Sequence, residues 1–135
     1  MYFLDSNICI DFLRGRMPYG YRFLKNNDPR LFKIPAIVEA ELRVGVAKSS
    51  DKERNRHALD TFLLPFDIVP FCSRCAREYA SIRIDLEQRG ERIGHNDLFI
   101  AATVRAYGGV LVTNNVKEFK HIPKLELESW AEIDL

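Results

Sequence analysis

Short apolar runs alternate along this chain with longer segments that have the periodicity of amphipathic helices. The run at 110–112, Val-Leu-Val, is hydrophobic throughout and is followed by polar residues, as expected of a central strand in a parallel sheet. The segment at 96–107 is apolar on nearly every side, which predicts a helix buried on most of its faces. Because strands and helices alternate without a repeat or a linker, we expect an α/β fold with three α/β/α layers around a mostly parallel sheet.

Glycine, proline and asparagine residues divide the chain into individual elements. The expected strands are 2–4, 31–35, 67–71, 110–112 and 125–128. One helix is expected between Ser6, as its N-cap, and Gly15, and others at 18–24, 36–48, 51–64, 73–87, 96–107 and 116–120. In such a sheet, functional residues gather beyond the carboxyl ends of the strands, so side chains at those positions are the first candidates.

Length and charge narrow the class of protein. A chain of 135 residues buries enough surface to form a core without disulfides or a structural metal, so we expect one domain over 1–135. A formal net charge of +1 argues against a protein that coats a polyanion through bulk charge, although it leaves nucleic acid open as a substrate. The sequence has no signal-peptide pattern, no run of about 20 apolar residues and an odd number of cysteines, which together favour the cytoplasm and no membrane association.

Two acidic residues stand where an element ends or begins. Asp5 ends the first apolar run, and this position directs its side chain into the crevice at the strand ends. Asp97 opens the mostly apolar helix at 96–107, so it lies at the edge of the core rather than on a solvated face. Each has an alternative role, because a carboxylate also caps a helix, or is stabilised by a helix N-terminus, whatever its function.

Glu41 is an acid within an apolar stripe of the helix expected at 36–48. On a helical wheel it falls between Ile37 and Val44, and an ionisable group in such surroundings is paired or metal-bound. Glu39 lies on the opposite side beside Arg43, in an i,i+4 spacing typical of a solvated surface. We therefore select Glu41 rather than Glu39 as a candidate ligand, with a purely structural role as its alternative.

Asp5, Glu41 and Asp97 come from three separate elements that a parallel sheet can bring together. Three clustered carboxylates repel one another unless they are protonated or bridged by a hard cation. We therefore expect a site for Mg²⁺ or Mn²⁺, with one metal or two. Such a site can activate water and neutralise the charge that develops on a phosphodiester.

Four segments in a fixed order carry a family likeness. They are YFLDSNICIDFLRG at the start, VEAELRVGVAKS, IGHNDLFIAATVRAYGGVLVTNN, and KEF before ELESW. Together they resemble the PIN-domain ribonucleases, specifically the VapC-type toxins of bacterial toxin–antitoxin modules, and the resemblance covers essentially the whole chain. It implies a PIN-like fold and places Asp5, Glu41 and Asp97 on the metal-binding acids of the family.

The last core strand is followed by a departure from the family pattern T-x-D-x-x-D/E-F. Here Thr113 is retained, Asn115 stands in place of the usual fourth acid, and Glu118 is retained. An amide oxygen is a weaker ligand than a carboxylate, so whether the free enzyme binds a second metal stays open. Glu118 or a substrate phosphate would complete the ligands of that metal. Beside the first acid, Ser6 stands where the family has Thr or Ser and is followed by Asn7, so both are expected to support the site.

The resemblance also implies an activity and partners. The expected reaction is divalent-metal-dependent endonucleolytic cleavage of RNA, within a tRNA or rRNA loop. It leaves a 5′-phosphate and a 3′-hydroxyl and inhibits translation. The expected assembly is a homodimer neutralised by a cognate VapB-type antitoxin, whose tail enters the active-site groove. Operator DNA would be bound by the antitoxin and not by this chain.

Other functions are weighed against the same residues. A phosphatase of the haloacid-dehalogenase type needs a second acid two residues after Asp5, but position 7 is Asn. A receiver-like signalling module needs a phosphoacceptor Asp and a Lys at later strand ends, and neither is present. A degenerate PIN domain that holds RNA or an antitoxin without cutting stays open because of Asn115.

Basic residues near the expected groove are candidates for RNA contact, with ordinary surface solvation as the alternative for each. They are Arg14, Arg16, Arg43, Lys48, Arg92 and Lys117. His95 adjoins Asp97 in sequence and is a further candidate for contact with substrate.

Overall fold

The computed structural model describes residues 1–16 and 18–130. Within these ranges the strands form a five-stranded sheet in the order β3-β2-β1-β4-β5, and every pair of neighbours is parallel. The strands are β1 (Tyr2–Leu4), β2 (Phe32–Pro35), β3 (Asp67–Val69), β4 (Val110–Val112) and β5 (Glu126–Glu128). The α/β class and the parallel sheet predicted from sequence are confirmed, with β4 inside the sheet and β5 at its edge.

The strand order reverses between β1 and β4. From β1 the chain adds β2 and β3 on one side, and it then returns to add β4 and β5 on the other. Leu4 pairs with Val112 at the ends of these two strands, so the residues that follow them, Asp5 and Thr113, emerge side by side. A reversal of this kind opens a crevice at the carboxyl ends of the strands, where ligands bind in open α/β sheets.

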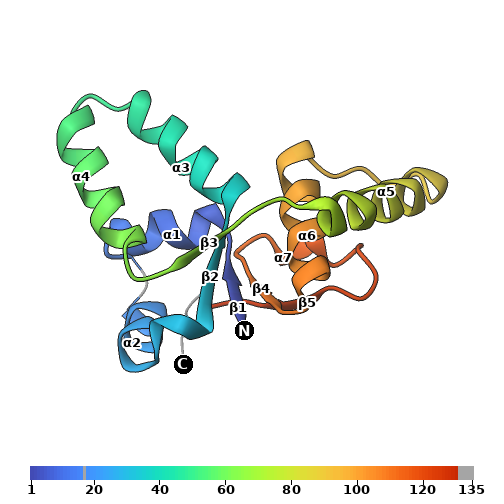
Figure 1. The fold of residues 1–135 in the computed structure, drawn as a ribbon, viewed down its shortest axis with the longest axis horizontal. Coiled ribbons are helices and arrows are strands. Elements are labelled where there is room, and N and C mark those ends of the chain that lie inside the picture. The colour runs from blue at the N-terminus through green and yellow to red at the C-terminus, as the bar shows by residue number, and fades with distance from the viewer. Residues whose placement is uncertain (17, 131–135) are drawn as a thin grey trace.

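Helices lie on both sides of the sheet (Figure 1), with α1–α4 gathered on one side and α5–α7 on the other. Their bounds are α1 (Ser6–Leu13), α2 (Pro18–Asn26), α3 (Ala36–Ala47), α4 (Lys52–Leu63), α5 (Ser73–Gln88), α6 (His95–Tyr107) and α7 (Val116–Phe119). These agree with the predicted segments to within two residues at each end, with a 3₁₀ turn at Pro29–Leu31 in addition. In the part of the chain described, no helix combines the length and apolar character needed to cross a bilayer.

The core lies between the sheet and the helices that cover it. Phe3 and Leu111, on the neighbouring strands β1 and β4, are fully buried, as is Ile100 of α6. The six residues of α6 from Leu98 to Val104 that are buried confirm the predicted burial of this helix on most of its faces. The helix ends at Gly108, whose φ of 76° is the left-handed conformation that glycine adopts most readily. A buried α6 with a fixed end holds its N-terminal turn beside the strand ends.

Gly109, between α6 and β4, allows a close approach that no other residue permits. A Cβ at this position would lie 2.5 Å from Cε2 of Phe3 and 2.9 Å from the carbonyl oxygen of Met1. Backbone and buried ring atoms cannot move away as a flexible side chain could. Gly45 of α3 has no atom within 4 Å of the same position, so it offers a matched control.

We expect Gly109→Ala to lower the free energy of unfolding by about 1–3 kcal/mol, because the added methyl group overpacks a filled core. Gly45→Ala should leave it unchanged or raise it by up to about 1 kcal/mol, because alanine is the better helix former. Urea denaturation of both variants measures the difference. Equal stability of the two variants would contradict the close packing of Gly109 on Phe3.

Candidate active site

Asp5 is a buried carboxylate held by three donors at the end of β1. Its residue is 2% exposed. Oδ1 accepts a hydrogen bond from the backbone N–H of Ser6 at 2.8 Å, and Oδ2 accepts one from the Thr113 hydroxyl at 2.7 Å. The Asn7 amide lies 3.4 Å from Oδ2. Asp5 rather than Ser6 is therefore the N-cap of α1. From the sequence, a helix cap and a site residue at the strand ends were alternative roles for Asp5, and in the structure it occupies both positions.

Thr113 joins the ends of β1 and β4. Its side chain is fully buried, and its hydroxyl donates to Asp5 while it accepts the backbone N–H of Asn115 at 2.9 Å. Asn7 makes a second link across the same gap, because its Oδ1 accepts the backbone N–H of Asn114 at 3.3 Å. The residues expected to support Asp5 thus fix its carboxylate from both neighbouring segments.

Glu118 of α7 is tied to two other parts of the site. Its Oε2 accepts a hydrogen bond from the Asn115 amide at 2.6 Å, and its Oε1 accepts the backbone N–H of Gly94 at 3.2 Å. Gly94 is the N-cap of α6, so Glu118 connects α7 to the helix that carries Asp97. Asn115 here acts as a donor, which an aspartate in the same place could not do when ionised.

Asp97 lies in the first turn of α6 among other carboxylates. Burial first, and then the negative charges of Asp5, Glu118 and Glu41, raise the pKa of Asp97 from its ordinary value of 3.8 to about 7. The pKa of Asp5 is also raised, chiefly by burial and against the opposing effect of the hydrogen bond from Thr113. The structure therefore brings the predicted acids into one electrostatically coupled group, joined by Glu118.

Glu41 has one carboxylate oxygen that is satisfied poorly and one that is not satisfied at all. Oε2 lies 3.4 Å from the Asn96 amide, whereas Oε1 is buried and has no hydrogen-bond partner among the described residues. The stripe used to select Glu41 is only partly buried, because Val44 is 52% exposed and the buried residues of α3 are Val38 and Leu42. Glu39, by contrast, pairs with Arg43 at 3.1 Å on the surface, as its spacing predicts.

Three polar residues of this region were not singled out from sequence. The Asn114 amide donates to the Asp11 carboxylate at 2.8 Å, and Asn96 contacts Glu41. Asn96 adjoins Asp97 in sequence, and Asn114 adjoins Asn115. This adjacency to predicted site residues is the only feature of the sequence that could have identified them. Their contacts depend on segments more than 50 residues apart, which periodicity does not reveal.

The donor set suits a hard divalent cation. In residues 1–16 and 18–130, no three Asp, Glu, His or Cys side chains stand arranged as a formed metal site. However, the buried Oε1 of Glu41 lacks a partner among the described residues, and burial together with the neighbouring negative charges raises the pKa of Asp97 to about 7. Carboxylate oxygens are the ligands that Mg²⁺ and Mn²⁺ prefer, and a cation would relieve both features. The residues present therefore fit such an ion.

The raised pKa of Asp97 predicts how stability changes with pH in the presence of a chelator. The folded protein holds a proton on Asp97 up to about pH 7, whereas the unfolded chain loses it near pH 3.8, so this group destabilises the fold increasingly as pH rises between these values. Asp97→Asn removes the effect. The variant should therefore gain more in melting temperature over the wild type at pH 8 than at pH 5. A gain independent of pH would contradict the coupled carboxylate group.

Comparisons with known proteins agree with this geometry. Residues 2–125 match the PIN domain family. Ribonuclease VapC2 from Rickettsia felis is 45% identical over 134 residues, which cover 96% of this chain and 98% of the relative. The tRNA(fMet)-specific endonuclease VapC from Shigella flexneri is 31% identical over 130 residues, with 96% and 98% covered. The crystal structure of VapBC2 from Rickettsia felis, bound to a DNA fragment from their promoter, aligns with a TM-score of 0.88 and 43% identity over 96% of this chain and 98% of that chain. This chain belongs to the PIN domain family, within its VapC group.

Proposed function

We propose that this protein is a divalent-metal-dependent endoribonuclease that acts as the toxin of a VapBC-type toxin–antitoxin system, with residues 1–135 forming one nuclease domain. The observation that carries the proposal is the coupled carboxylate group at the ends of β1 and β4, with the unpartnered buried oxygen of Glu41. Full-length similarity to proteins named ribonuclease and endonuclease supports the same conclusion. Inhibition of translation in the cytoplasm follows from cleavage of an RNA that the ribosome uses.

Asp5, Glu41 and Asp97 are the residues that would hold Mg²⁺ or Mn²⁺. When bound, such an ion lowers the pKa of water and neutralises charge on the phosphodiester that is cut. The chain's own contribution is orientation: Thr113 and Ser6 fix the two oxygens of Asp5, and Asn7 lies beside them. The first-turn position of Asp97 places its carboxylate at the positive end of α6.

Asn115 and Glu118 form the other side of the site. The Asn115 amide holds one oxygen of Glu118, and the backbone of Gly94 holds the other. With an amide in place of the fourth acid, the free enzyme has fewer charged ligands for a second ion, and phosphate oxygens of the RNA would complete that position. Attack by water in line with the leaving oxygen then yields a 5′-phosphate and a 3′-hydroxyl.

The proposed partners follow from the same site. An antitoxin tail fits the groove between α1, α3 and α4, a space of about 280 Å³ that Glu41 lines together with Ile10 and Leu13. A cationic residue of the tail would there meet the acids, and the VapBC complex of Rickettsia felis supports an antitoxin of the VapB type. We propose a homodimer as the toxin's own assembly, with operator DNA bound through the antitoxin. The Shigella flexneri relative favours tRNA over rRNA as substrate.

Cleavage of total cellular RNA tests the proposal, with Glu41→Gln and Glu39→Gln as a matched pair on one helix. Wild type and Glu39→Gln should cut RNA in Mg²⁺ or Mn²⁺ and stop in chelator, because Glu39 is a surface residue paired with Arg43. Asp5→Asn and Glu41→Gln should lose activity by at least about 100-fold, the scale on which removal of a metal's support lowers activity.

The same experiment distinguishes the nuclease from the alternative of a degenerate PIN domain that binds RNA without cutting it. Binding of RNA with no cleavage in either metal would favour that alternative, which Asn115 suggests. Cleavage that is equal in Asp5→Asn and wild type, or that persists in chelator, would contradict the metal-dependent nuclease.

A further inference from the structure

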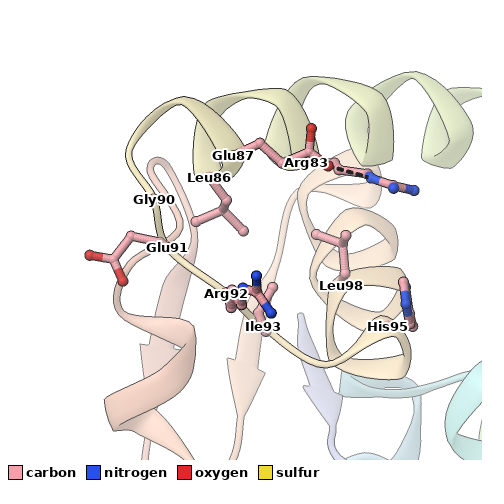
Figure 2. Close-up of a pocket in the computed structure, with 9 residues that line it drawn as sticks. All are labelled: Arg83, Leu86, Glu87, Gly90, Glu91, Arg92, Ile93, His95 and Leu98. Atoms are coloured by element: carbon pink, nitrogen blue, oxygen red, sulfur yellow. Dashed lines mark hydrogen bonds and ion pairs between the residues drawn. The ribbon is translucent and has the colours of Figure 1, made fainter.

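A cleft of about 620 Å³ lies where α5 ends and α6 begins, outside the carboxylate group described above. Figure 2 shows Leu86 of α5 and Leu98 of α6 extending into the space between the two helices, where both are buried and form the floor of the cleft. Ile93, from the connecting loop, adds a third apolar side chain, and Arg92 and His95 line the same space. The volume falls within the range of roughly 300–1,000 Å³ that is typical of sites for small ligands.

One arginine that lines the cleft, Arg92, has no carboxylate paired with it among the described residues. Arg83 pairs with Glu87 at 3.0 Å, so these two charges cancel. Glu91 points away from the other lining residues in Figure 2, and its carboxylate lies 3.8 Å from His121. Arg92 is exposed and makes neither a hydrogen bond nor an ion pair through its side chain with any described residue. A guanidinium group is charged at every physiological pH, so it is available for an anion.

The cleft adjoins the carboxylate group through two residues of chain. Arg92 is two residues from Gly94, a span of at most about 7 Å. The Gly94 N–H donates to Glu118, and a Cβ on Gly94 would lie 4.0 Å from Oδ2 of Asp97. The cleft is therefore near enough to these acids to receive the nucleotide that flanks the phosphate cut there.

The acids themselves cannot attract the RNA, because they carry the same charge as its phosphates. Affinity for single-stranded RNA comes instead from cations that contact phosphates and from surfaces on which a base can lie. The cleft offers the cation through Arg92, and the half-buried Ile93 and the exposed His95 beside it offer the surface. Arg92, with its planar guanidinium, suits the oxygens of a phosphate better than a lysine would.

We propose that this cleft is a nucleotide subsite, in which Arg92 binds the phosphate next to the one that is cut and the flanking nucleotide lies over Ile93 and His95 at the mouth of the cleft. The subsite rests on the proposed function, since it assigns the flanking nucleotide of that same RNA. It makes Arg92 a positioning residue that affects binding of the RNA and not the chemical step.

The test compares Arg92→Gln with Arg54→Gln, which removes an exposed arginine from α4 on the other side of the sheet. Fluorescently labelled bulk tRNA in chelator reports binding, and the same RNA with Mg²⁺ reports cleavage. Arg92→Gln should raise Kd and KM about tenfold with kcat within about twofold, and the slope of log K against log salt should become shallower by about 0.7, as for one lost contact to single-stranded phosphate. Arg54→Gln should match the wild type.

The outcomes separate this subsite from the proposed function. If wild type cleaves and Arg92→Gln binds tRNA with unchanged Kd and salt slope, the subsite is wrong while the nuclease stands. If Arg92→Gln weakens binding but wild type does not cleave, the nuclease is wrong while the RNA cleft stands. Polyglutamate that binds as tightly as tRNA, and that loses as much affinity in Arg92→Gln, would show a surface for an acidic protein partner and overturn the RNA assignment.

Discussion

Repulsion among carboxylates at one edge of a parallel sheet is the constraint on which the rest of this site depends. Asp5 follows β1 and is buried, and Asp97 stands close enough for the charges of Asp5, Glu118 and Glu41 to help raise its pKa to about 7. Folding gathers these groups only because a core of strands and the buried helix α6 supplies the compensating free energy. A cluster of this kind persists in a fold when an ion or a proton neutralises it.

The hydrogen bonds around the acids divide them into two kinds. Asp5 and Glu118 have partners on both oxygens, from Ser6 and Thr113 in one case and from Gly94 and Asn115 in the other. Glu41 keeps a buried oxygen without a partner in the described residues. Fixed carboxylates give the site its shape, while the unpartnered oxygen leaves a ligand position for a cation. The reversal of strand order between β1 and β4 places the fixed carboxylates and the unpartnered oxygen beside the same crevice.

Much of this arrangement could be predicted from the sequence, since local patterns determine much of it. The Val-Leu-Val run of β4 and the nearly all-apolar α6 predict a central parallel strand and a buried helix, and both are confirmed. Asp5 was selected by its place after a strand. The hydrogen bond from Thr113 to Asp5 joins residues 108 apart, and no periodicity predicts it. Arg43, a candidate for RNA contact, is held by Glu39 and Asp60, whereas Arg92 has no such partner, and only three-dimensional structure separates the two.

Calorimetric titration of the metal-free protein with MnCl₂ tests most directly whether the acids form a cation site. We predict saturable binding that is tighter at pH 8 than at pH 6, because Asp97 must lose its proton and its pKa is about 7. Asp5→Asn should abolish this binding, and Glu39→Gln should not change it. Binding of equal affinity in Asp5→Asn and wild type, or the same affinity at both pH values, would contradict the account.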